Sequence, residues 1–177
     1  NATLNICDCQ GGGRITLDSG SAICVTTVNG SNAHTTLNLY GGTISTDDTF
    51  DSGTIKLYNN DENNSQTVAV FNMYGGEVYN RDNGESAVYA SYANIGTGYY
   101  EFNMYGGSIT CEEGHGFEFN NNKNVAVKIT GGTITGGWYG IYLSSQNTLT
   151  LAGNPKFIDK AYYSGTANIY IPDNVIL

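Results

Sequence analysis

The sequence contains little proline, methionine, tryptophan or positive charge. Of its 177 residues only 2 are proline, 2 are methionine and 1 is tryptophan, and lysine and arginine together number 7. It therefore lacks the clustered cations that binding to nucleic-acid phosphates or to an anionic membrane requires. It also lacks an apolar run of the roughly 18 residues that a transmembrane helix needs. We expect neither a nucleic-acid partner nor insertion into a membrane.

The abundant residues are those of short strands and tight turns. Glycine occurs 24 times and tyrosine 14 times, asparagine and threonine are frequent, and 40% of the residues are hydrophobic. Threonine and tyrosine favour strands, while glycine and asparagine favour turns. The apolar content is too high for a disordered chain. The net charge of −9 comes with only 13% charged residues, a modest surplus of acid on a polar surface. We predict one all-β domain spanning residues 1–177.

A short motif returns along the chain. Two apolar residues two positions apart are followed by one further residue, a Gly-Gly pair and another strand, as in Leu37-Asn38-Leu39-Tyr40-Gly41-Gly42. The first glycines of the copies stand at positions 41, 75, 106, 131 and 153, so the spacings are 34, 31, 25 and 22 residues. An earlier copy, interrupted by an insertion, runs from Leu4 to Ile15. Such periods are typical of stacked solenoid repeats, and a propeller blade would need roughly 40 residues or more.

A second strand lies between successive motifs. It is marked by apolar pairs at i and i+2, and no segment shows a helical period. Each repeat thus contains three short strands, which predicts a right-handed, single-stranded parallel β-helix of about six coils. The apolar pairs are Ile23/Val25, Ile55/Leu57, Val88/Ala90, Phe117/Phe119 and Ile141/Leu143.

Strand alternation predicts which side chains point inward and which point outward. The predicted core column is Leu37/Leu39, Phe71/Met73, Phe102/Met104, Val127/Ile129 and Leu149/Leu151. The same strands place two rows outside, Asn38, Asn72, Asn103, Lys128 and Thr150, and Tyr40, Tyr74, Tyr105, Thr130 and Ala152. The outward row of the other strand is Cys24, Lys56, Tyr89, Glu118 and Tyr142.

Three of these outward tyrosines are predicted to form an aromatic ladder. Adjacent parallel strands lie about 4.8 Å apart, so Tyr40, Tyr74 and Tyr105 stack along the solenoid. One interpretation is a polysaccharide-binding surface. Sugar rings would lie against the aromatic planes, and side-chain amides would form hydrogen bonds with the edges of the sugar rings. The other is packing between neighbouring strands. Trp138, after a glycine pair, is either a loop anchor or a binding platform. The candidate ligand-binding residues are Tyr40, Tyr74, Tyr105, Asn38, Asn72, Asn103, Tyr89, Tyr142 and Trp138.

The loops contain acidic clusters but no recognisable metal motif. Asp47, Asp48 and Asp51 are the best calcium candidates, yet they lack the spacing of a calcium loop, and a solvated loop is the alternative. We expect no resident cofactor.

The four cysteines are Cys7, Cys9, Cys24 and Cys111. They match no zinc spacing. They are either buried or partly buried thiols, or Cys24 forms a disulfide with Cys7 or Cys9.

An enzyme is the third alternative, because parallel β-helices host pectate lyases and polygalacturonases. A hydrolase needs two or three carboxylates on one outward face, and a lyase needs a base with calcium-binding carboxylates. The outward row offers only Lys56 and Glu118, separated by Tyr89. No nucleophile elbow is present, and we expect no catalysis.

The repeats Phe71-Asn72-Met73-Tyr74-Gly75-Gly76 and Phe102-Asn103-Met104-Tyr105-Gly106-Gly107 resemble the "FNMxGGxI" repeats of large surface proteins from gut and related anaerobic Gram-positive bacteria. The segment from Leu4 to Ile15 resembles one that often opens such arrays. The last copy departs from the pattern, because Asn154-Pro155 replaces the second glycine and its follower.

The resemblance implies a non-catalytic, adhesin-like module that is secreted or anchored to the cell wall. It also implies flanking domains in the same chain, so we expect this to be a piece of a larger multidomain protein. The module would act in adhesion or display, or as a rigid spacer. Its expected partner is a polysaccharide or a host glycan or protein surface. A carbohydrate-binding module that uses the tyrosine ladder is the alternative.

Overall fold

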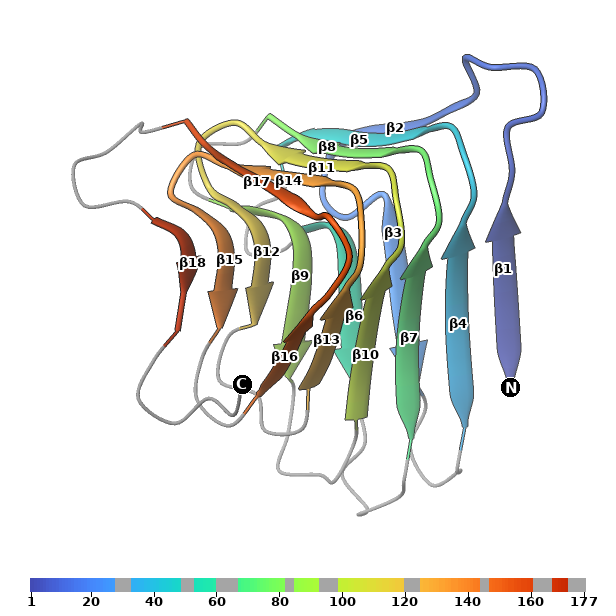
Figure 1. Cartoon of the computed structure of the whole chain (residues 1–177). Helices are drawn as coiled ribbons and strands as arrows, with labels where there is room; N and C mark the ends of the chain where they lie inside the picture. Colours follow the sequence, from blue (N-terminus) through green and yellow to red (C-terminus); the bar gives the residue numbers. More distant parts are fainter. Residues whose placement is uncertain are drawn as a thin grey trace.

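The computed structural model describes residues 1–27, 33–48, 53–59, 67–81, 85–92, 99–119, 125–143, 147–160 and 167–171. These segments form eighteen strands and no helix, so no described helix is long and apolar enough to cross a membrane. The strands build three six-stranded parallel sheets, and each coil contributes one strand to every sheet (Figure 1). The predicted parallel β-solenoid with three strands per coil is thus confirmed.

Each sheet takes every third strand in chain order. Sheet A contains β1 (Ala2–Ile6), β4 (His34–Leu39), β7 (Val68–Met73), β10 (Tyr99–Met104), β13 (Val125–Ile129) and β16 (Thr148–Leu151). Sheet B contains β2 (Arg14–Ser19), β5 (Thr43–Asp48), β8 (Glu77–Asn80), β11 (Ser108–Cys111), β14 (Thr133–Gly136) and β17 (Lys156–Asp159). Sheet C contains β3 (Ile23–Thr27), β6 (Gly53–Asn59), β9 (Ser86–Tyr92), β12 (His115–Phe119), β15 (Tyr139–Leu143) and β18 (Ala167–Tyr170).

The register of sheet A reproduces the alignment of the repeats. Leu37 pairs with Phe71, Phe71 with Phe102, Phe102 with Val127 and Val127 with Leu149. The interrupted first copy joins the same sheet, because β1 pairs with β4 through Leu4 and Leu37. Equivalent side chains therefore stack directly on one another from coil to coil.

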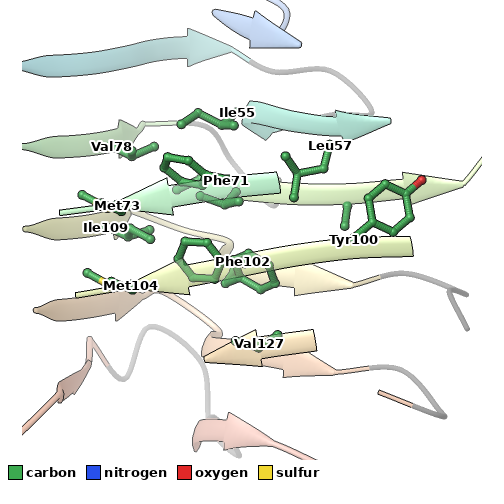
Figure 2. Packing of buried hydrophobic residues seen from close by; sticks show 14 of the residues in the cluster. Ile55, Leu57, Phe71, Met73, Val78, Tyr100, Phe102, Met104, Ile109 and Val127 are labelled. Carbon is green, nitrogen blue, oxygen red and sulfur yellow. The ribbon is translucent and has the colours of Figure 1, made fainter. Parts of the chain in front are cut away.

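The core is a column of large apolar side chains inside the coils (Figure 2). Phe71 and Phe102 stack with ring centroids 5.3 Å apart, and Phe117 from sheet C packs on Phe102 at 4.5 Å. Met73 and Met104 form the neighbouring column and are fully buried. Alternation along each strand thus produces a closed interior, although no single strand is longer than seven residues.

The Gly-Gly corner between sheets A and B needs its two glycines for different reasons. The second glycine of the pair, such as Gly107 with φ 83°, adopts a left-handed conformation that side chains disfavour. The first makes a close contact instead, because a Cβ on Gly106 would lie 2.7 Å from the carbonyl oxygen of Tyr74 in the preceding coil. The motif therefore encodes both the turn and the stacking distance.

Candidate functional site

The tyrosine ladder on sheet A lies where the repeat predicts it. The rings of Tyr40 and Tyr74 stack at 4.8 Å with 5° between their planes, and those of Tyr74 and Tyr105 stack at 4.9 Å with 9°. All three side chains are exposed, with relative accessibilities between 43% and 48%. The ladder is thus both a packing feature and a surface feature.

The ladder does not present its aromatic faces in the way that a sugar platform requires. Both faces of the Tyr74 ring are covered by neighbouring rings, yet Tyr74 remains 44% exposed. The exposed parts are therefore ring edges and hydroxyl groups. The expectation that sugar rings lie on the planes of this ladder is wrong for its middle ring, since those planes already pack on tyrosine.

A row of asparagines runs beside the tyrosines. The Asn103 amide Nδ2 donates to Asn72 Oδ1, Asn72 Nδ2 donates to Asn38 Oδ1, and Asn38 Nδ2 donates to Asn5 Oδ1, at 2.8–2.9 Å. Asn5 extends the predicted row into the first coil, where the insertion in the repeat had obscured it. All three bonds point the same way along the solenoid, so the amides form one polar chain that ends beside Lys128.

We expect Tyr74→Ala to destabilise the protein more than Tyr40→Ala. Tyr74 stacks on two rings and Tyr40 on one, and an aromatic pair contributes about 0.5–1.5 kcal/mol beyond its buried area. The loss in the free energy of unfolding, measured by urea titration, should be larger for Tyr74→Ala by about that amount. Equal losses for the two variants would show that ring stacking does not stabilise the ladder.

A second aromatic cluster lies on the outer face of sheet C. The His115 ring stacks on Tyr139 at 5.3 Å and on Tyr142 at 5.1 Å, and Trp138 meets it edge-on at 5.4 Å. Tyr142 stacks in turn on Tyr170 at 5.0 Å. Trp138 thus anchors a corner against a histidine, which fits the first of its two interpretations.

Sequence reasoning missed this cluster because alternation breaks where the chain enters sheet C. Strict alternation would place His115 on the same side as the buried Phe117. The residue between them, Gly116, is itself buried, and a Cβ there would lie 2.7 Å from the carbonyl oxygen of Gly140 in the next coil. The His115 ring lies against that of the outward residue Tyr142. The available signal was a glycine at the same point in both coils, just before Phe117 and Ile141.

Burial shapes the electrostatics of this cluster. His115 is 6% exposed, its Nδ1 has no hydrogen-bond partner among the described residues, and burial lowers the pKa of its imidazole to about 4. Burial raises the pKa of the neighbouring Glu118 carboxyl, although the Ser86 hydroxyl donates a hydrogen bond to it. Burial likewise raises the pKa of the Tyr142 phenol, with a smaller contribution from Tyr170. The surroundings thus favour the neutral form of each group.

We expect His115→Phe to weaken the dependence of stability on acid pH. The pKa of His115 is about 4 in the folded protein, against 6.5 for the unperturbed group. Between pH 4 and pH 6.5 His115 is therefore protonated in the unfolded chain but neutral in the folded protein. As the pH falls from 6.5 towards 4, His115 therefore lowers the free energy of unfolding by about 3 kcal/mol. Phenylalanine keeps an aromatic ring but does not titrate. Urea unfolding at pH 4.5 and pH 7 measures the difference, and an unchanged pH dependence would contradict the assignment.

The other outward residues of sheet C keep their predicted places without forming a catalytic set. Tyr89 pairs with Lys56 on one side and Glu118 on the other, and Lys56 Nζ lies 5.4 Å from the centre of the Tyr58 ring. Among the described residues, no group of three or more His, Cys, Asp and Glu side chains could hold a metal ion. The chemistry on this face is mainly that of phenol and hydroxyl groups.

The calcium candidates lie at the edge of the described structure. Asp47 is exposed and lies near the end of β5, which ends at Asp48. Asp51 and the side chain of Asp48 lie outside the described structure. The calcium site stays a prediction.

The cysteines correct one expectation. Cys111 is buried, but Cys7, Cys9 and Cys24 are exposed, and all four are free thiols. The interpretation as buried or partly buried thiols is therefore right only for Cys111, and no bridge joins Cys24 to Cys7 or Cys9. Cys7 lies just beyond the end of β1 and Cys24 in sheet C, so different sheets hold them apart.

Comparison of the chain with protein-family models, with curated proteins and with solved structures gave no match.

Proposed function

We propose that the chain is a non-catalytic extracellular β-solenoid module of a bacterial cell-surface protein, in which it acts as a rigid unit for display and adhesion. The observation that carries this proposal is the continuous outer face of sheet A, where tyrosine and asparagine ladders run from coil to coil. Ring edges, hydroxyls and amides on a regular backbone make a polar surface with few charges, which suits contact with an extended partner.

Rigidity is the second element of the proposal. Each coil is bonded to the next through three parallel strand pairs, and the buried aromatic column adds packing along the same axis. With about 4.8 Å between coils, the six coils span about 24 Å from first to last. A module of this kind separates its two ends by a fixed distance.

Bead adhesion tests the display face. Beads coated with the chain are expected to adhere to surfaces carrying host glycoproteins or cell-wall polysaccharides. Replacement of Tyr40, Tyr74 and Tyr105 by serine should reduce adhesion, whereas Lys56→Ala on sheet C should not. Circular dichroism establishes that both variants are folded. Adhesion that is unaffected by the serine variant would show that sheet A is not the contact face.

A carbohydrate-binding module is the second candidate, favoured by the exposure of the ladder. Because the faces of Tyr74 are covered, a glycan would contact its hydroxyl group and the exposed edge of its ring. Tyr74→Phe keeps the stack and removes that hydroxyl, so it should weaken retention on the bound polysaccharide by about 2–10-fold, the value of one hydrogen bond. Retention unaltered by Tyr74→Phe would exclude hydroxyl contact at the middle of the ladder.

A further inference from the structure

The hydroxyl groups of the tyrosine ladder form a regular row on the outside of sheet A. The rings of Tyr40, Tyr74 and Tyr105 repeat at 4.8 and 4.9 Å with nearly parallel planes. All three side chains are exposed, and no described residue forms a hydrogen bond with their hydroxyl groups. The row therefore offers one phenol per coil just beyond the ends of β4, β7 and β10, which lie side by side (Figure 1).

The asparagine row runs parallel to the tyrosines, two positions earlier in each coil. Asn38, Asn72 and Asn103 are half-buried, and each donates one amide N–H to the amide of the preceding coil. A side-chain amide has two N–H donors, and the second one has no partner among the described residues. The two rows therefore border a strip of surface, here called the donor strip, on which these coils each supply one phenol and one amide donor.

The stacking of the rings limits how a ligand contacts the donor strip. Both faces of the Tyr74 ring are covered, so a ligand meets its edge and its hydroxyl group. The edge of an aromatic ring carries partial positive charge, and the amide N–H and phenol O–H groups are donors. The donor strip therefore favours a ligand that presents a line of oxygen atoms rather than an apolar face.

Charge restricts the ligand further. From Asn5 to Asn103 and from Tyr40 to Tyr105 the two rows contain no charged residue, and Lys128 follows only in the next coil. The chain as a whole carries a net charge of −9, and such a charge repels polyanions at a distance. An uncharged polymer matches both properties, whereas a uronic acid polymer or a sulfated polysaccharide matches neither.

We propose that the donor strip binds an extended β-1,4-linked glucan that runs along the solenoid axis with one glucose unit per coil. Both bonds of this linkage are equatorial, so the chain is nearly straight and advances per sugar by a length close to the coil spacing of about 4.8 Å. Its ring hydroxyls are also equatorial and lie along the two edges of the chain. The inference rests on the proposal that the outer face of sheet A is the contact surface, and it adds the class of partner and its direction.

The length of the asparagine row predicts the length of the bound glucan. The row spans the four coils from Asn5 to Asn103. Each added glucose, up to four, should raise the association constant by about 2–10-fold, the value of one net hydrogen bond. Isothermal titration calorimetry with cello-oligosaccharides of two to six units measures this dependence, and longer chains should bring little further gain. An affinity that does not change with length would overturn the proposal.

Variants at the two ends of the ladder test the direction of the chain. Tyr40→Phe and Tyr105→Phe keep the stacked rings but remove one hydroxyl group each. Cellotetraose along the axis reaches both positions, so each variant should weaken its binding by about 2–10-fold, and the two losses should multiply in the double variant. Tyr58→Phe, in β6 of sheet C, is the matched control and should leave binding unchanged. A glucan lying across the coils would use one coil at a time, so single variants with wild-type affinity would refute the axial direction.

The stereochemistry of the sugar tests the class of partner. Malto-oligosaccharides coil because their linkage is α-1,4, manno-oligosaccharides carry an axial hydroxyl on every ring, and oligogalacturonates are charged. Each should bind about 10-fold more weakly than cellotetraose or worse, since at least one hydrogen bond is lost. Maltotetraose or an oligogalacturonate that binds as tightly as cellotetraose would contradict the proposal.

The bead assay separates this inference from the proposed function. If the triple serine variant loses adhesion while the wild-type chain binds no cello-oligosaccharide, sheet A contacts another partner, and the glucan proposal alone is wrong. If cello-oligosaccharides bind as expected while bead adhesion does not depend on the ladder, glucan binding stands and the role of sheet A in adhesion fails.

Discussion

Phe102→Ala is expected to lower the free energy of unfolding by about 3–5 kcal/mol, the loss typical of a large aromatic side chain removed from a packed interior. Phe102 is fully buried in the fourth coil, where it contacts Phe71 of the third coil and Phe117 of its own coil. Its removal opens a cavity between coils that the regular backbone cannot close, because each strand is fixed by hydrogen bonds on both sides. Urea unfolding followed by circular dichroism measures the loss.

The matched control for this variant is Phe157→Ala. Phe157 lies in the last described coil, pairs with Ile134 on one side and with no other described strand on the other, and is partly exposed. The same substitution should therefore cost distinctly less there than in the middle of the stack. In a solenoid each repeat is stabilised by its immediate neighbours, so position along the stack sets the cost. Equal losses for Phe102→Ala and Phe157→Ala would contradict this account of the core.

Gly107→Ala is expected to destabilise the protein by about 2–5 kcal/mol, from a left-handed backbone conformation together with overpacking. Gly107 has φ 83°, and an added Cβ would lie 2.6 Å from the Gly76 carbonyl oxygen and 2.7 Å from Met73 Cε. The oxygen belongs to the backbone of the preceding coil. The methyl group can be accommodated only if two hydrogen-bonded coils move apart.

Gly11 separates the two contributions to this loss. It has φ 79°, close to that of Gly107, but nothing lies within 4 Å of a Cβ built on it. Gly11→Ala should therefore cost only the conformational part, about 1–2 kcal/mol. Thermal and urea unfolding of both variants give the comparison. If Gly11→Ala were as damaging as Gly107→Ala, backbone conformation alone would explain the corner glycines, and close stacking would not.

The repeat predicted much of the candidate site. Because the copies that start at residues 37, 71 and 102 place Asn and Tyr at the same positions relative to their inward residues, Asn72 and Tyr74 had to lie beside Asn103 and Tyr105 once the strands were parallel. The side-chain rows on sheet A follow from that local alternation. The sequence did not predict that the tyrosine rings lie parallel and cover one another, since ring orientation depends on the neighbouring coil.

The cluster around His115 is the clearest feature that strand alternation did not predict. It lies where three consecutive residues, His115, Gly116 and Phe117, are all buried, with Gly116 packed against Gly140 of the next coil. Its low pKa likewise results from burial among rings contributed by other strands. Neither feature can be deduced from the residues adjacent to His115 in the sequence.

The sequence by itself determined the solenoid, its three strands per coil, its core column and its outward rows. These depend on the two-residue alternation of inward and outward side chains along a strand and on the repeat of the motif from coil to coil. Both can be read directly from the sequence. Only the tertiary structure decided which ring faces are covered, which thiols are exposed and where alternation breaks. Those properties depend on contacts between coils that are 20 to 35 residues apart, whose geometry is fixed when the coils stack.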